Sequence, residues 1–165
     1  MTTSSIPSSP VEFLEAQRLE QAKANGFSFF IIRPSDDQPG FAYSIGMAQH
    51  DLPELLCYFN TEEMGVATLG LMHNLCTTLI ESGKRFGRNG TLGAFCNRTI
   101  QAHDPDVTYT PTFLQGDTYM YALKTVLTRA VMFRKELGLP QVIELRHDDV
   151  PTIEAVRAQL MMAAS

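Results

Sequence analysis

The stretch that most constrains the fold runs from Gly40 to Asn60 and reads GFAYSIGMAQHDLPELLCYFN. Residues 41–45 are rich in aromatic and apolar residues and are followed by a glycine, as in a strand that enters a tight turn. Pro53 disfavours helix in the residue before it, so the polar residues around it predict a connection. Residues 55–59 are almost wholly apolar, which is typical of a strand covered on both faces. The stretch therefore predicts two strands joined by a compact connection.

Helical and β-rich patterns alternate on both sides of this stretch. The predicted helices are 9–25, 60–83, 118–137 and 151–162, and the further predicted strands are 27–33, 95–102, 107–113 and 141–145. The helices 60–83 and 118–137 are the longest, and each carries a single apolar stripe. We therefore expect an α+β fold with a mainly antiparallel sheet and two long helices packed on one of its faces.

The 165 residues fit a single domain with a substantial core. The first eight residues are small and polar and include a proline, so we expect 1–8 to be a flexible tail and 9–165 to be one α+β domain. Three cysteines, Cys57, Cys76 and Cys96, describe neither a disulfide framework nor a zinc site, and we expect them in the core. This cysteine usage predicts a reducing, cytoplasmic location.

The charge and hydropathy patterns exclude two classes of partner. A formal net charge of -5 gives no reason to expect binding to nucleic acid, which requires concentrated positive charge. No apolar run approaches the roughly 20 residues that a membrane-spanning helix requires. The first residues also lack the basic and apolar regions of a secretory signal.

Three segments of the chain resemble a known family. They are Gly40–Met47, Pro53–Leu56 and Pro140–Leu145, which are similar to the "PFAYTVGL…HPEL" core and the later "PVLQLVWPD" segment of domain of unknown function 4262. The resemblance covers about residues 26–149 in the same order of elements. The chain departs from the pattern at Leu52, where the family often has His, and at residues 146–148, which replace Val-Trp-Pro. The resemblance implies a fold shared with uncharacterised bacterial proteins and implies no activity.

No complete catalytic or nucleotide-binding motif occurs, so we assign no catalytic residue and expect no cofactor. The dipeptides His103–Asp104 and His147–Asp148 are each followed by another acid and contain metal-ligand types. Neighbouring residues of a strand point to opposite faces, and Asp is common in turns, so we favour turns over a metal site. Whether the two pairs converge stays open.

His73 and Cys76 lie three residues apart on the predicted helix 60–83, which allows their side chains to touch. Cys76 belongs to the apolar stripe, whereas a nucleophilic thiolate needs an open, electropositive setting. We therefore interpret Cys76 as a core residue and His73 as a histidine at the solvent boundary.

The candidate ligand-binding residues are Tyr43, Ser44, His50, Arg85 and Arg88. Tyr43 and Ser44 point to opposite faces of one strand, and His50 follows on a loop where it can join whichever faces an opening. The alternative is that Tyr43 packs and His50 is exposed. Arg85 and Arg88 lie in a glycine-rich loop, and guanidinium groups recognise phosphate and carboxylate well.

Two functions follow as hypotheses. The first is a binding or protein-interaction domain without catalysis, which the missing motifs and the eight methionines favour, because methionine suits adaptable surfaces. Met161 and Met162 predict an apolar patch that joins two copies as a homodimer. The second hypothesis is a small-molecule-binding protein or enzyme that acts on an anionic ligand.

Overall fold

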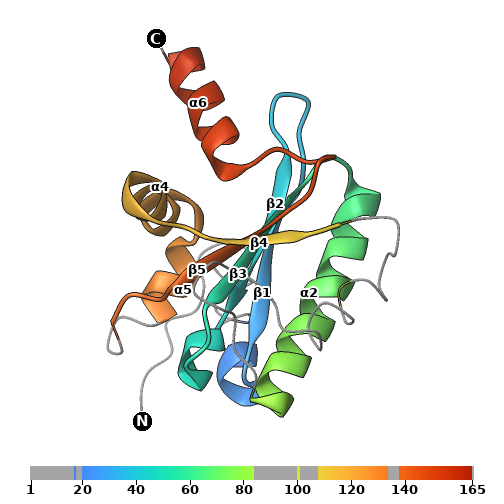
Figure 1. The fold of residues 1–165 in the computed structure, drawn as a ribbon, viewed down its shortest axis with the longest axis vertical. Coiled ribbons are helices and arrows are strands. Elements are labelled where there is room, and N and C mark those ends of the chain that lie inside the picture. The colour runs from blue at the N-terminus through green and yellow to red at the C-terminus, as the bar shows by residue number, and fades with distance from the viewer. Residues whose placement is uncertain (1–16, 18–19, 84–99, 101–107, 134–137, 165) are drawn as a thin grey trace.

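The computed structural model describes residues 17, 20–83, 100, 108–133 and 138–164 (Figure 1). Five strands form one sheet in the order β1-β2-β3-β5-β4. They are β1 (Ser28–Ile32), β2 (Gly40–Ile45), β3 (Glu54–Phe59), β4 (Thr110–Phe113) and β5 (Val142–Arg146). Only the β3–β5 pair is parallel among these strands, and the other three pairs are antiparallel. The predicted mixed fold with a mainly antiparallel sheet is therefore confirmed.

The first three strands form an antiparallel meander, and a tight turn at Gly46 joins the second strand to the third. Tyr43 of β2 pairs with Phe30 of β1 and with Leu56 of β3. Gly46 has a φ of 95°, a conformation that favours glycine, and it starts the short 3-10 helix η1 (Met47–His50) that leads into β3. Every residue of β3 is buried, as its apolar sequence predicts.

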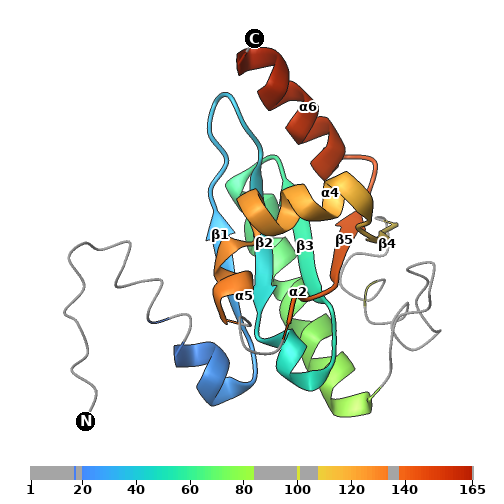
Figure 2. The same ribbon diagram turned by 90° about the vertical axis from the view of Figure 1, so that its left-hand side faces the viewer.

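Helices cover both faces of the sheet. The 21-residue helix α2 (Glu62–Ser82) lies on one face, and α4 (Gly116–Tyr121) and α5 (Thr128–Phe133) lie on the other (Figure 2). The expectation of two long helices on a single face is not confirmed, because α2 is the one long helix among those described here and the segment predicted as the second helix packs on the opposite face. An apolar stripe shows that one side of a helix is buried, but it carries no information on which face of the sheet buries it.

The predicted helix 118–137 is interrupted by a π-helical turn, η2 (Ala122–Val126). The backbone N–H of Leu127 donates to the carbonyl of Ala122, five residues earlier, at 2.8 Å. One residue is thereby inserted into the helical ladder, and α5 starts only at Thr128. Leu127 is nevertheless buried, so the apolar stripe alone does not reveal the interruption.

The start of α2 differs slightly from the predicted start of this helix at residue 60. Thr61, and not Asn60, is the N-cap, because its hydroxyl accepts from the backbone N–H of Met64 at 3.1 Å. The Asn60 side chain donates instead to the backbone carbonyl of Asp149 at 2.6 Å. It thereby ties the end of β3 to the turn that precedes α6 (Ile153–Ala164).

The sheet separates two buried apolar clusters. The α2 side contains Leu71, Leu75 and Leu79 packed on alternate residues of β3, and the opposite side contains Leu123, Leu127, Ile153 and Val156. Cys57 and Cys76 are free, buried thiols in the first cluster, as predicted. The tail 1–8 and Cys96 lie outside the described residues, and of the predicted strand 95–102 only Ile100 is described, as a helical and buried residue.

Candidate functional site

A cleft of about 510 Å³ opens between the start of β1 and the second half of α2. The helical residues 20–25, just before β1, complete its wall. The lining residues are Gln21, Asn25, Phe27, Ser28, Phe29, His73, Thr77, Ile80 and Glu81. A volume of this size lies within the roughly 300–1,000 Å³ typical of small-molecule sites.

Aromatic rings form the rigid part of the wall. Phe27 and Phe29 occupy alternate positions and meet edge to face, with ring centroids 5.6 Å apart and an interplanar angle of 72°. The imidazole of His73 lies 5.4 Å from the Phe27 ring and 6.5 Å from the Phe29 ring, centroid to centroid. Both phenylalanines also pack against the α2-side core, which holds the rings in place.

Polar groups of α2 form the facing side of the cleft. His73, Thr77 and Glu81 are spaced four residues apart, so they lie one above another on the same helical face. His73 and Glu81 are exposed and Thr77 is half-buried, so all three are open to a ligand. His73 is thus a solvent-boundary histidine, as predicted.

The sequence shows the residue spacings that build the two walls of this cleft, but it does not show that these walls pack side by side. The two-residue spacing of Phe27 and Phe29 and the four-residue spacing of the α2 polar groups are both visible in the sequence. Nothing local shows that the start of β1 packs beside the second half of α2. The sequence therefore does not predict the cleft, although it does place His73 at the solvent boundary.

The predicted site residues Tyr43 and Ser44 are both buried. Tyr43 stacks on Phe30, with ring centroids 5.7 Å apart, and on Phe41. Ser44 donates through its hydroxyl to the Glu54 carboxylate at 2.8 Å and accepts from the backbone N–H of Leu55 at 2.8 Å. Neither residue lines the cleft.

His50 and its neighbour Gln49 hold the chain at Gly26, next to the cleft. The Nε2 atom of His50 lies 2.9 Å from the carbonyl oxygen of Gly26, and the Gln49 amide donates to the same oxygen at 2.7 Å. Gly26 connects two lining residues, so His50 supports the wall from behind without lining the cleft. Arg85 and Arg88 lie outside the described residues, so whether they join His50 stays a prediction.

A buried carboxylate organises the turn between β2 and β3. Glu54 is fully buried and accepts from the Ser44 hydroxyl and from the backbone N–H groups of Gly46 and Met47. These two N–H groups open η1 and have no partner within that short helix. Glu54 therefore replaces the missing partners, and its hydrogen bonds fix the shape of the turn.

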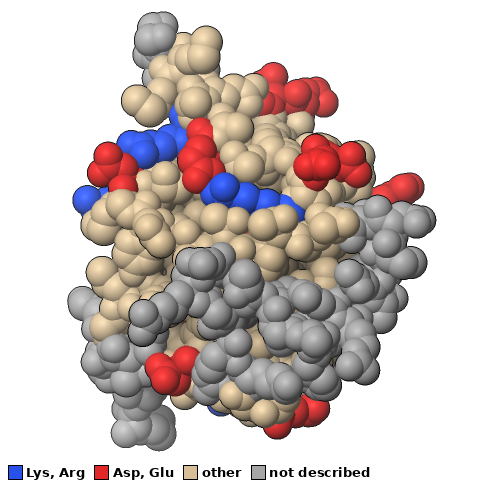
Figure 3. Space-filling view, in the orientation of Figure 1, with Lys and Arg blue, Asp and Glu red and all other residues tan. Residues whose placement is uncertain are grey.

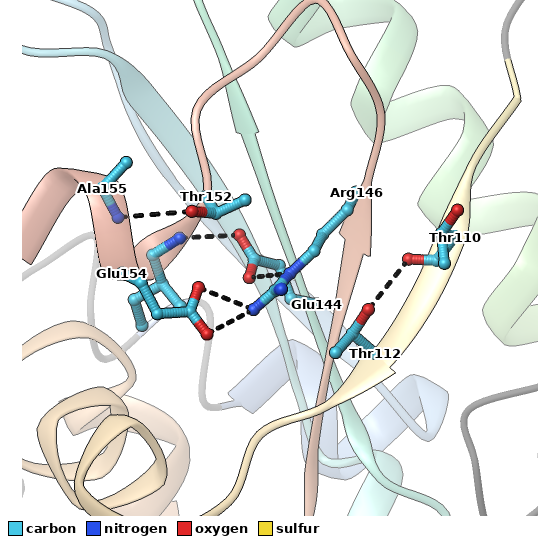
Figure 4. Close-up of polar contacts among 8 residues, drawn as sticks. Thr110, Thr112, Glu144, Arg146, Thr152, Glu154 and Ala155 are labelled. Atoms are coloured by element: carbon cyan, nitrogen blue, oxygen red, sulfur yellow. Dashed lines mark hydrogen bonds and ion pairs between the residues drawn. The ribbon is translucent and has the colours of Figure 1, made fainter.

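A second carboxylate, Glu144 of β5, lies at the start of α6 (Figure 4). One of its oxygens accepts from Arg146 Nε at 2.7 Å, and the other accepts from the backbone N–H of Ile153 at 2.9 Å. Arg146 also donates through Nη2 to both oxygens of Glu154, each at 2.7 Å. This cluster fastens α6 to the sheet.

Burial dominates the acid–base properties of Glu144. It raises the pKa of the carboxyl to about 7 from the ordinary 4.5, although the Arg146 charge and the hydrogen bonds act in the opposite direction. A single Arg146 is shared between two carboxylates, which limits its compensation of Glu144. Burial followed by the Glu144 charge also raises the pKa of the neighbouring Cys57 thiol to about 12, so this thiol is unreactive.

Acidic and basic side chains lie interleaved on the face that carries β4, β5 and α6 (Figure 3). This face shows no extended region of one sign among the described residues. Within the described part of the chain, no helix is long and apolar enough to cross a membrane. No group of three potential metal ligands gathers there either.

The His147–Asp148 dipeptide lies in a turn, as the sequence interpretation favoured. The Nδ1 atom of His147 accepts from the backbone N–H of Asp149, and the imidazole meets the Tyr109 ring edge to face. The other dipeptide, His103–Asp104, lies outside the described residues. Convergence of the two pairs is therefore not tested.

No protein-family model, curated protein or solved structure matches the chain.

Proposed function

We propose that the protein is a small-molecule-binding domain whose ligand occupies the cleft between β1 and α2. The observation that carries the proposal is a cleft of ligand size that is lined by two aromatic rings and by several polar side chains. Such a combination gives both affinity and orientation, because apolar surface drives binding while a few polar groups select the ligand.

The aromatic side of the cleft is ordered before a ligand arrives. Phe27 and Phe29 contact each other, His73 and the α2-side core. A ligand that stacks on them therefore loses little binding free energy to the ordering of side chains. This preorganisation favours recognition of a ligand with a flat or apolar body.

Binding without catalysis is favoured by what lines the cleft. Among the described lining residues there is no cysteine or lysine, and the two described cysteines lie in the core. Ser28, a possible nucleophile by type, donates its hydroxyl hydrogen to the Gln21 amide oxygen at 3.2 Å and not to a base.

A compound screen by thermal shift tests the proposal, with His73→Ala as the cleft variant and Asn74→Ala as the control. Asn74 is the next residue of the same helix and is exposed, but it does not line the cleft. We expect stabilising compounds to lose their effect in His73→Ala and to keep it in Asn74→Ala. A screen without any stabilising compound, or equal losses in both variants, would contradict the proposal.

A second proposal concerns self-association through the end of α6. The described part of this helix extends beyond the sheet in both views (Figures 1 and 2), and Met161 and Met162 are 63% and 76% exposed. An apolar pair at a projecting helix end is suited to a symmetric contact between two copies. Light scattering should give a dimer that Met161→Asp converts to a monomer. A monomeric wild-type protein at micromolar concentration would remove this proposal.

A further inference from the structure

We infer that the cleft between β1 and α2 selects an organic cation, namely a ligand with an apolar or aromatic body and a protonated amine. This inference rests on the proposed function and specifies its ligand class. The first observation is the charge of the wall. Glu81 is the only formally charged residue among the described lining residues, and neither lysine nor arginine is among them.

The second observation is the direction of α2. Its C-terminal end lies at the cleft, because Thr77, Ile80 and Glu81 line the cleft and the helix ends at Ser82. Peptide dipoles give a helix C-terminus a partial negative charge, and the last turn of α2 contains no basic residue to compensate for it. The Glu81 carboxylate and the helix end therefore act in the same direction and attract a cation.

The third observation is the aromatic wall. The face of a phenyl ring carries negative electrostatic potential and attracts ammonium groups. Phe27 and Phe29 line the same cleft as Glu81 and contact His73, so a ligand whose amine pairs with Glu81 has ring faces elsewhere in the cleft for its apolar body. His73, two turns from Glu81, adds a third flat surface.

The rival is the anionic ligand predicted from Arg85 and Arg88. These residues follow α2 in the sequence, with Lys84 before them, and all three lie outside the described residues. The described residues that line the cleft favour a cationic ligand instead. A direct comparison of charges on one molecular frame therefore separates the two hypotheses.

The test is an NMR titration with three probes that share a phenyl ring and a two-carbon chain: 2-phenylethylamine, 2-phenylethanol and phenylacetate. Chemical-shift changes at Phe27, Phe29 and Thr77 report occupancy of the cleft. An ion pair at an exposed site contributes modestly, so we expect the amine to bind about threefold to fivefold more tightly than the alcohol. We expect phenylacetate to bind most weakly.

Glu81→Gln and Glu63→Gln form a matched pair of variants. Both remove one exposed carboxylate from α2, but Glu63 lies at the opposite end of the helix, away from the cleft. Glu81→Gln should reduce the preference for the amine over the alcohol to less than about twofold and leave the affinity for the alcohol unchanged. Glu63→Gln should keep the wild-type preference.

The outcomes distinguish the two proposals. Tightest binding by phenylacetate, or equal binding of all three probes with no effect of Glu81→Gln, overturns cation selection and leaves a ligand-binding cleft. Failure of all three probes to bind also overturns cation selection. The proposed small-molecule-binding function is also contradicted only if the wider compound screen gives no ligand whose binding depends on His73.

Discussion

Glu54 shows how one buried residue can determine the shape of a turn. Its two carboxylate oxygens receive three hydrogen bonds, two of them from backbone N–H groups that open η1. An amide in the same place offers one acceptor oxygen and one donor group, so at least one N–H would face another donor. The carboxylate is thus specified by the backbone that surrounds it, and not by a ligand.

We predict that Glu54→Gln lowers the free energy of unfolding by about 1–3 kcal/mol, the usual cost of leaving a buried donor without an acceptor. Urea unfolding followed by circular dichroism measures the change. The control is Glu63→Gln, which alters an exposed carboxylate in the first turn of α2 and should cost less, about 0.3–1 kcal/mol, through its lost interaction with the helix dipole. Equal stabilities of the two variants would contradict the account of the turn.

Glu144 should make the stability of the protein depend on pH, because the pKa of its carboxyl is raised in the folded protein to about 7 from 4.5. Between these values the folded state binds more protons than the unfolded state, so stability should fall as the pH rises from about 4.5 to about 7. Burial is the cause, since the ionised carboxylate is less well solvated inside the protein than in the unfolded chain.

The prediction is tested by urea unfolding across this pH range in the wild-type protein and in Glu144→Gln. The difference between the two profiles isolates Glu144, because the other titrating groups are common to both. Glu154 contributes with the opposite sign: partial burial raises its pKa, but the hydrogen bond and charge of Arg146 lower it overall. A difference between the profiles that stays constant with pH would contradict the raised pKa.

At the scale of elements, the close packing of α2 on the sheet depends on two glycines that contact the ring of Phe59. The side chain of Phe59 lies between Gly40 and Gly65, and a Cβ atom at either position would come within 2.5–2.7 Å of a Phe59 ring atom. Ring atoms of a buried phenylalanine cannot move aside as the end of a flexible chain can. The side chain of Phe59 therefore fits between β2 and α2 only if both positions remain glycine.

Gly65→Ala tests this fit. Alanine favours the helix by about 1 kcal/mol over glycine, whereas overpacking a core costs about 1–3 kcal/mol, so we expect a net loss of stability on the order of 1 kcal/mol. The control is the neighbouring Val66→Ala, because Val66 is 73% exposed and should tolerate the change. A thermal melt that shows Gly65→Ala to be more stable than wild type would refute the close packing.

The elements were predictable where their signals are local. The strands β1 to β3 follow from apolar runs bounded by turns, and α2 follows from its stripe and the final glycine at 83. The π turn before Leu127 was not predictable, because its apolar residues are buried whether or not the ladder is interrupted. The faces of the sheet and the cleft depend on packing between distant segments, which no local pattern specifies.

At the scale of the whole molecule, the two apolar clusters share the central strands. Alternate residues of β3 contribute to the α2-side cluster and to the opposite one, with Leu55 in the first and Leu56 in the second. Loss of either cluster leaves one face of β3 without its cover. The two clusters therefore depend on each other.

We predict a single cooperative unfolding transition. Leu75→Ala in one cluster and Leu127→Ala in the other should each cost about 2–5 kcal/mol and shift the same transition, because both leucines are fully buried. Far-ultraviolet circular dichroism and tyrosine fluorescence should give coincident curves in all three proteins. Two separate transitions would show that the faces of the sheet unfold independently.

The parallel β3–β5 pair has a consequence for synthesis on the ribosome. The β1–β2–β3 meander can form soon after it emerges from the ribosome. The second neighbour of β3 in the sheet, β5, is translated only after α2, β4 and α5. Until then the growing chain presents an apolar strand with an open edge, which is a template for pairing with other chains. Pauses in translation before β5 should therefore be the interval in which this protein depends most on chaperones.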